Sequence, residues 1–234
     1  MFEKLLSLFF VPCRPFLLLA KTTAKFLLEI NAIHFNSVSP FTLTSGLKSP
    51  VYIDCRKLIS YPKARSILVN FCSDIVVNKI GLDKVESLVG GETAGIPFAS
   101  FLASKLELPM HYVRKKPKGF GVNNYIEGNN IKGKKVILVE DLTTDGGSKI
   151  KFCNSIRKAG ATVEETIVLF YYNIFDDVPD KLKKSGINLN YLACWWDILN
   201  YCKEDKSIID YETITQIEQF LISPEEWSNN SNKI

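Results

Sequence analysis

The sequence predicts an α/β fold built on a mainly parallel sheet. Segments with the pattern of buried strands alternate with amphipathic helical segments along most of the chain. Two glycine-rich turns, at 90–95 and 143–148, each follow such a strand and precede a helix. The 234 residues, 46% of them hydrophobic, suffice for a single core. Ligands of such sheets bind outside the carboxyl ends of the strands, so we expect the functional residues at these two turns.

The first third of the chain contains two predicted helices and one short strand. Apolar residues recur at helical spacing over 23–35, which predicts the first helix. A turn-rich stretch, 41–49, leads into a strand at 51–54. The second helix is predicted over 62–80, because a proline stands in its first turn and a glycine follows its last residue.

The rest of the chain alternates strands and helices. The charged, glycine-containing stretch 115–127 shows no periodicity and is predicted to be a long loop. Gly160 is expected to end one of the helices. The predicted elements are strands at 86–89, 110–114, 136–139, 162–172 and 189–193, and helices at 96–106, 147–159 and 208–221.

The N-terminus differs from the rest of the chain. Apolar runs at 5–11 and 16–20 are interrupted by prolines and Arg14. A membrane span needs about 20 unbroken apolar residues, and a signal peptide needs an uninterrupted apolar region. We therefore expect residues 1–20 to be an N-terminal extension of one domain, residues 21–234. A membrane-associated binding module remains as an alternative that rests only on these first residues, and we expect no membrane partner.

Charge and cysteine usage narrow the function class. The net charge of +4 is mild, which suits an enzyme of anionic substrates and does not indicate a nucleic-acid partner. The six cysteines lie far apart, without zinc-site or redox spacing. They are expected to be reduced thiols of a cytoplasmic protein.

The segment 136–148, VILVEDLTTDGGS, predicts a sugar-phosphate site. Four apolar residues lead to Glu140 and Asp141, and a tight glycine-rich turn then opens a helix. Glycines let the turn approach a ligand closely, and a helix N-terminus favours an anion. Two carboxylates suit such a place if they accept hydrogen bonds from sugar hydroxyls or act through a hard cation. Asp145 adds a negative charge to the turn, and we expect its side chain to point away from the phosphate.

This segment resembles the phosphoribosyl-pyrophosphate signature of the type I phosphoribosyltransferases. Three further segments, 41–56, 90–97 and 112–121, resemble the N-terminal segment, the pyrophosphate loop and the mobile catalytic loop of the orotate phosphoribosyltransferases. The resemblance covers roughly residues 21–200 in the family's order. It implies the type I phosphoribosyltransferase-like fold, with a central mainly parallel sheet flanked by helices, a small hood and a mobile catalytic loop.

The resemblance also implies a reaction and a set of site residues. Members of the family make orotidine 5′-monophosphate and pyrophosphate from orotate and phosphoribosyl pyrophosphate, in the synthesis of UMP. Mg²⁺ is expected to be carried by the substrate's pyrophosphate, and the enzyme to be a homodimer with shared active sites. The implied catalytic residues are Lys118, Arg114 and Asp141. The implied substrate-binding residues are Lys115, Glu140, Thr143, Thr144, Asp145, Gly146, Gly147, Ser148, Thr93, Tyr52 and Lys48.

Two other functions stay open at this point. One is transfer to a different nucleobase, because the strand that ends at Asn173 lacks the arginine that commonly binds the orotate carboxylate. Lys48 and Arg56 are nearby cations that would compensate. Thr144 replaces the aspartate of purine-specific relatives, which favours a pyrimidine. The other function is that of a non-catalytic relative that senses phosphoribosyl pyrophosphate, but this would need an added DNA-binding domain.

Overall fold

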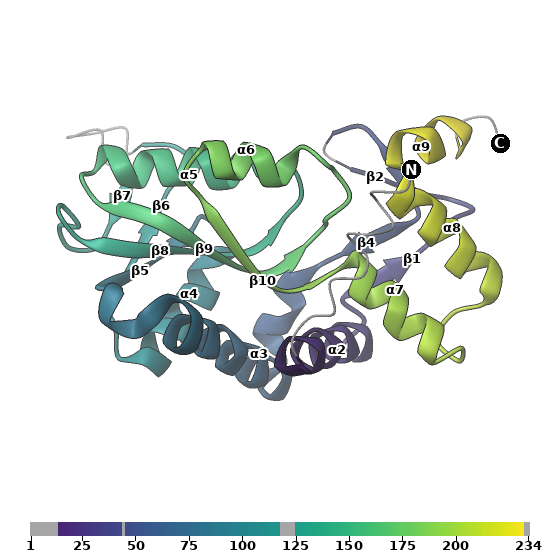
Figure 1. The fold of residues 1–234 in the computed structure, drawn as a ribbon, viewed down its shortest axis with the longest axis horizontal. Helices are drawn as coiled ribbons and strands as arrows, with labels where there is room; N and C mark the ends of the chain where they lie inside the picture. Colours follow the sequence, from purple (N-terminus) through teal and green to yellow (C-terminus); the bar gives the residue numbers. More distant parts are fainter. Residues whose placement is uncertain (1–13, 44, 118–124, 232–234) are drawn as a thin grey trace.

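The centre of the molecule is a six-stranded sheet in the order β10-β9-β8-β5-β6-β7 (Figure 1). The computed structural model describes residues 14–43, 45–117 and 125–231. The strands are parallel except β7, which pairs antiparallel with β6. The strands of this sheet are β5 (Ser87–Gly91), β6 (Met110–Val113), β7 (Ile126–Glu127), β8 (Lys135–Thr143), β9 (Thr162–Tyr171) and β10 (Asn188–Cys194).

Helices cover both faces of the sheet. Figure 1 shows α2, α3 and α4 below it and α5 and α6 above it. A buried apolar cluster lies on each side, because the strands are buried on both faces and read as continuous hydrophobic runs. The helices are α2 (Arg14–Glu29), α3 (Pro62–Asp74), α4 (Gly95–Leu106), α5 (Gly147–Lys158) and α6 (Val178–Lys184). Three short helices flank α3: the 3₁₀ helix η1 (Cys55–Ser60), the π-helix η2 (Ile75–Gly81) and the 3₁₀ helix η3 (Leu82–Lys84).

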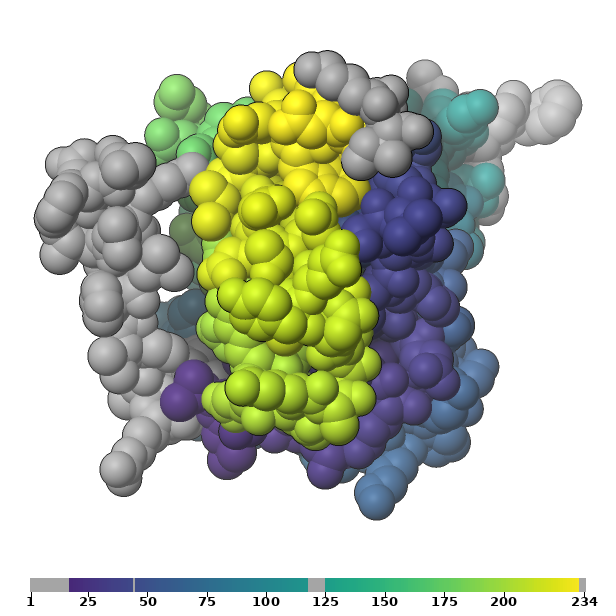
Figure 2. All heavy atoms as spheres, turned by 90° about the vertical axis from the view of Figure 1, so that its right-hand side faces the viewer, coloured from purple at the N-terminus to yellow at the C-terminus, as the bar shows by residue number. Residues whose placement is uncertain are grey.

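A smaller layer forms the hood beside the sheet. It combines segments from both ends of the chain: the Lys48 amide donates to Ser228 Oγ at 2.9 Å. Figure 2 shows the C-terminal helices (yellow) beside the segment around residue 50 (dark blue) on this face. The elements of the hood are β1 (Ile33–Phe35), β2 (Phe41–Thr42), β3 (Lys48–Ser49), β4 (Val51–Ile53), α7 (Trp195–Glu204), α8 (Tyr211–Ile222) and α9 (Pro224–Ser231), with β1 paired to β4 and β2 to β3.

The predicted fold class is confirmed, but some element boundaries were wrong. The first helix ends at Glu29 rather than near residue 35, since Asn31 adopts a positive φ of 53° and the chain then enters β1. That helix also begins at Arg14, so the predicted division at residue 20 falls inside α2. The predicted loop 115–127 ends in the short strand β7, and α6, α7 and α9 were not predicted.

The acidic strand is longer than predicted. β8 continues past Val139 to Thr143 and stays in register with β9, where Thr143 pairs with Tyr171. The two carboxylates are therefore part of the sheet and not of the turn. Within the described ranges, no helix is long and apolar enough to cross a membrane.

Candidate active site

The two adjacent carboxylates of β8 point to opposite faces of the sheet. Side chains alternate along a strand, so Glu140 follows Leu138 toward α5, whereas Asp141 follows Val139 toward the other face. Glu140 is 6% exposed, and its Oε2 accepts a hydrogen bond from Lys149 Nζ at 2.9 Å. Of the two carboxylates, Asp141 is therefore the one left half-exposed at the carboxyl end of β8.

Burial raises the pKa of both carboxyl groups. For Asp141, the positive charges of Lys149 and Arg56 and hydrogen bonds from backbone amides oppose this rise. For Glu140, Lys149 and Lys115 oppose it, whereas the charge of Asp141 adds to it. Lys115 is therefore within electrostatic range of Glu140, and Arg56 is within range of Asp141. With Lys149, this places five charged side chains near the end of β8.

The turn between β8 and α5 has the geometry of an anion cradle. Gly146 adopts a φ of 73°, a conformation that side chains rarely take, and α5 then begins at Gly147. Asp145 Oδ1 accepts a hydrogen bond from the Gly147 amide at 3.0 Å. That this carboxylate points away from a phosphate stays a prediction; in the structure it bonds to an amide at the N-terminus of α5.

The hydroxyl groups of this turn differ in their surroundings. Thr143 is 1% exposed, and its Oγ1 has no hydrogen-bond partner among the described residues. Ser148 Oγ accepts a hydrogen bond from Lys149 Nζ at 3.2 Å. Thr144, which lies between these two residues in the sequence, is half-buried.

The second glycine-rich turn packs directly against Glu140. A Cβ atom at Gly91 would lie 2.5 Å from Glu140 Oε1, and one at Gly95 would lie 2.7 Å from the same oxygen. Real Cβ contacts are longer than this, so both positions need glycine. The exposed Thr93 lies between these glycines.

The base of the predicted catalytic loop is joined to the same turn. The Lys115 amide donates to Glu92 Oε2 at 2.7 Å, and Lys115 itself is exposed. The Arg114 amide donates to the Tyr125 carbonyl at 2.8 Å, which closes the two ends of the loop. Lys118, predicted to be catalytic, lies outside the described residues.

The predicted base-binding residues lie in the hood. Tyr52, on β4, is half-buried with its ring 5.5 Å from that of Phe41. Lys48 Nζ donates to Thr42 Oγ1 at 3.0 Å. The hydrogen bond to Asp54 raises the pKa of Arg56, and the charges of Tyr52 and Asp141 add to this. Arg56 thus lies within electrostatic range of both the β4 tyrosine and the acidic strand.

Sequence reasoning missed Lys149. This lysine is 3% exposed and pairs with Glu140, yet it was assigned no role. One signal was present: Lys149 shares the buried face of α5 with apolar residues at helical spacing, where a charge requires a partner. The other members of that face are Phe152, Cys153 and Ile156.

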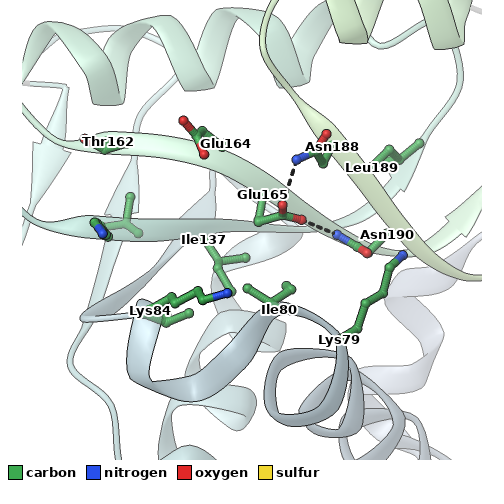
Figure 3. Close-up of a pocket in the computed structure, with 13 residues that line it drawn as sticks. Lys79, Ile80, Lys84, Ile137, Thr162, Glu164, Glu165, Asn188, Leu189 and Asn190 are labelled. Atoms are coloured by element: carbon green, nitrogen blue, oxygen red, sulfur yellow. Dashed lines mark hydrogen bonds between the residues drawn. The ribbon is translucent and has the colours of Figure 1, made fainter.

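A separate cavity of about 770 Å³ lies at the amino ends of the strands, away from the two glycine-rich turns. Its walls include Lys135, Thr162 and Asn188, the first residues of β8, β9 and β10. Figure 3 shows Thr162 and Asn188 in this lining. Lysines and glutamates are mixed there, and Glu165 is bonded to the side-chain amides of Asn188 and Asn190 at 2.8 Å each. A mixed lining at the amino ends of the strands does not suit a polyanionic substrate.

Comparison with protein families supports the resemblance seen in the sequence. Residues 67–198 match the model of the phosphoribosyl transferase domain. The chain is 49% identical over 215 residues to an orotate phosphoribosyltransferase of Roseobacter denitrificans, covering 92% of this chain and 95% of the relative. It is 51% identical over 209 residues to the enzyme of that name from Dinoroseobacter shibae, covering 89% of this chain and 92% of the relative.

Solved structures show the same architecture. Orotate phosphoribosyltransferase from Aeropyrum pernix superposes with a TM-score of 0.68 at 31% identity, covering 77% of this chain and 98% of that chain. UMP synthase from Leishmania donovani superposes with a TM-score of 0.74 at 25% identity, covering 86% of this chain and 42% of that longer chain.

Proposed function

This chain belongs to the orotate phosphoribosyltransferase family, and we propose that it transfers the phosphoribosyl group of phosphoribosyl pyrophosphate to orotate. The products are orotidine 5′-monophosphate and pyrophosphate. One observation carries the proposal beyond the family name: the half-exposed Asp141 lies near the carboxyl end of a strand that leads into a glycine turn and a helix N-terminus. A sugar phosphate needs this combination of a carboxylate and an anion cradle.

We propose separate tasks for the groups around the sugar. Asp141 accepts hydrogen bonds from the ribose hydroxyls, whereas the buried Glu140 acts through its ion pair with Lys149 rather than on the sugar. The turn at the start of α5 binds the 5′-phosphate with its amides and hydroxyls, and Asp145 moves off the Gly147 amide to admit it. The turn residues in this role are Thr143, Thr144, Asp145, Gly146, Gly147 and Ser148.

Cations at the catalytic loop stabilise the departing pyrophosphate. Breaking the bond at C1 gives an oxocarbenium-like transition state, and negative charge grows on the leaving group. We propose that Arg114, Lys115 and Lys118 neutralise this charge, with Thr93 holding the pyrophosphate at its own turn. The bond between Lys115 and Glu92 supports this role, since it ties the base of the loop to the pyrophosphate turn.

Mg²⁺ fits the proposed site as a companion of the substrate. The described residues contain no group of three side chains able to hold a metal by themselves. Mg²⁺ usually keeps several waters and is bound through substrate phosphates, so the pyrophosphate of the substrate would carry the ion into the site. When bound, the ion supplies charge neutralisation to the leaving group.

We propose that the base is held in the hood. The aromatic ring of Tyr52 would pack against the orotate ring, and Lys48 and Arg56 would balance its carboxylate in place of the missing arginine. Arg56 supports this arrangement, because its charge interacts with both Tyr52 and Asp141. We further propose a cytoplasmic homodimer in which the catalytic loop serves the neighbouring site.

Activity with competing bases tests the assignment. Purified protein is supplied with phosphoribosyl pyrophosphate, Mg²⁺ and, in turn, orotate, uracil, hypoxanthine and nicotinate, and release of pyrophosphate is followed. Orotate is expected to be consumed fastest. Equal or faster turnover of another base would identify a phosphoribosyltransferase of different specificity, which the absent arginine makes the second candidate. Binding without turnover of any base would indicate a non-catalytic relative.

A further inference from the structure

Lys149 stands where neither local structure nor burial favours a lysine. It lies in the first turn of α5, where the helix dipole repels a cation, and only 3% of it is exposed. A buried ammonium is costly unless a carboxylate balances it. Glu140 balances this charge, because its Oε2 lies 2.9 Å from Lys149 Nζ. The exposed fraction is 4% for the Lys149 side chain and 8% for the Glu140 side chain.

The position of Glu140 gives this ion pair a consequence for the site. With Oε2 held by Lys149, Oε1 lies under Gly91 and Gly95 of the pyrophosphate turn. Lys149 Nζ also donates to Ser148 Oγ, in the phosphate turn. One buried pair therefore connects the two turns that the proposed function assigns to the two ends of the same substrate.

We propose that Lys149 is a positioning residue that holds the two turns in register through Glu140 and leaves Asp141 as the acid facing the sugar. The inference rests on the proposed function. It goes beyond that function because Lys149 need not touch the substrate. Its contribution is the fixed distance between the two anion-binding turns, so its loss acts mainly on the binding of phosphoribosyl pyrophosphate.

The charges around Asp141 give the pair a second, measurable effect. Burial raises the pKa of Asp141, and the positive charges of Lys149 on α5 and Arg56 on η1 lower it. Besides burial, the charge of Asp141 raises the pKa of Glu140, and because repulsion between two carboxylates is mutual, the charge of Glu140 acts on Asp141 in the same direction. The Cys55 thiol, whose pKa is raised by burial and by the charge of Asp141, is a further titratable neighbour. Removing Lys149 therefore raises the pKa of Asp141, whereas removing the charge of Glu140 lowers it.

A double-mutant cycle tests the proposal. Lys149→Met, Glu140→Gln and the double variant are compared with the wild type, and Lys151→Met, on the exposed face of the same helix, serves as control. Each single variant leaves a buried charge unpaired, so we expect KM for phosphoribosyl pyrophosphate to rise roughly tenfold, with a smaller change in kcat. The double variant is expected to return within about threefold of the wild type.

The pH profile separates positioning from a general loss of structure. A carboxylate that works ionised loses activity as pH falls through its pKa. The acid limb of kcat/KM is therefore expected to move to higher pH in Lys149→Met, to lower pH in Glu140→Gln, and to return in the double variant. A lesion that only loosens the fold would lower activity without opposite shifts.

Several results would overturn the inference. One is a double variant as impaired as the product of the two singles, because Glu140 or Lys149 would then act on the substrate independently. An unchanged KM for phosphoribosyl pyrophosphate together with an unchanged pH profile in Lys149→Met would also overturn the inference. If Lys149→Met does not fold, the double variant must fold and bind, and its failure to do so rejects the pairing.

Calorimetric titration with phosphoribosyl pyrophosphate and Mg²⁺ distinguishes this inference from the proposed function. A wild type that binds the substrate but does not convert orotate contradicts the function only. A wild type that converts orotate, with equal binding by Lys149→Met, contradicts the inference only.

Discussion

Gly95 tests how tightly the pyrophosphate turn packs on the acidic strand. In a Gly95→Ala variant the new Cβ would lie 2.3 Å from the Val139 carbonyl oxygen, 2.7 Å from Glu140 Oε1 and 3.1 Å from Glu140 Cα. Two of these atoms belong to the backbone of a central strand, and the third belongs to a buried ion pair. None is the free end of a flexible side chain, so α4 must shift away from β8.

The expected cost follows from this geometry. Overpacking of a core costs about 1–3 kcal/mol, and the rigid neighbours place Gly95→Ala at the upper end. Alanine regains up to about 1 kcal/mol of helix propensity, because Gly95 is the first residue of α4. A net loss of about 2 kcal/mol lowers Tm by roughly 4–8 °C for a chain of this size. KM for phosphoribosyl pyrophosphate is expected to rise as the turn moves.

Gly147→Ala is the matched control for stability. Gly147 begins α5 after the other turn, but the three atoms nearest to its Cβ would all belong to the Asp145 side chain, the nearest at 3.1 Å. That side chain can rotate, so the Tm of Gly147→Ala is expected to stay within about 2 °C of the wild type. Thermal unfolding of the two variants is measured side by side. Equal Tm values, with unchanged KM in Gly95→Ala, would refute the tight packing inferred here.

Three further changes test other parts of the molecule. Asp141→Asn is expected to lower kcat/KM for phosphoribosyl pyrophosphate, by an amount equivalent to about 1.5–3 kcal/mol of lost stabilisation, with little loss of folding stability. An unchanged kcat/KM would contradict the role of Asp141. Asp145→Ala frees the Gly147 amide, so it is expected to tighten binding of inorganic phosphate, measured by calorimetry, and to cost about 1 kcal/mol of stability for the lost hydrogen bond, measured by thermal unfolding. Weaker phosphate binding would refute the competition for that amide. Lys118→Ala and Asp141→Asn homodimers, each strongly impaired, are unfolded and reassembled together. Roughly a quarter of wild-type activity should return if the loop serves the neighbouring site, whereas mixed dimers without recovery would reject a shared site.

The local signals were sufficient for the strand–turn–helix motifs but not for every boundary. The motif at 136–148 was predicted from residues adjacent in sequence, and the structure places β8, the turn and α5 there. The end of α2 was missed because Ile33 continues the helical apolar pattern, although it is buried as part of β1. A short apolar run near a helix end fits either period, and strand pairing with β4 decided it.

The missed helices are short, and α7 also lacks the usual start signal. α7 follows β10 without a break, and its amino end is capped by Cys194 and Asp197 rather than by serine or threonine. α6 has only seven residues, too few to show a period. In the site, both adjacent acids were predicted to face the substrate. The alternation of side chains along the strand instead turns them to opposite faces, where Glu140 pairs with Lys149. That partner is nine residues away and could not be assigned before α5 was placed on the sheet.

The hydrogen bond between Lys48 and Ser228 has a consequence for biosynthesis. It joins residues 180 positions apart, as β3 packs against α9. A ribosome adds about 5–20 residues per second, so β3 waits roughly 10–40 s for its partner to emerge. The sheet from β5 to β9 is complete earlier and can form while the chain is still being made. The hood, with Tyr52 and Lys48, is therefore finished last, and an unfinished chain exposes a formed phosphate turn before it has a place for the base.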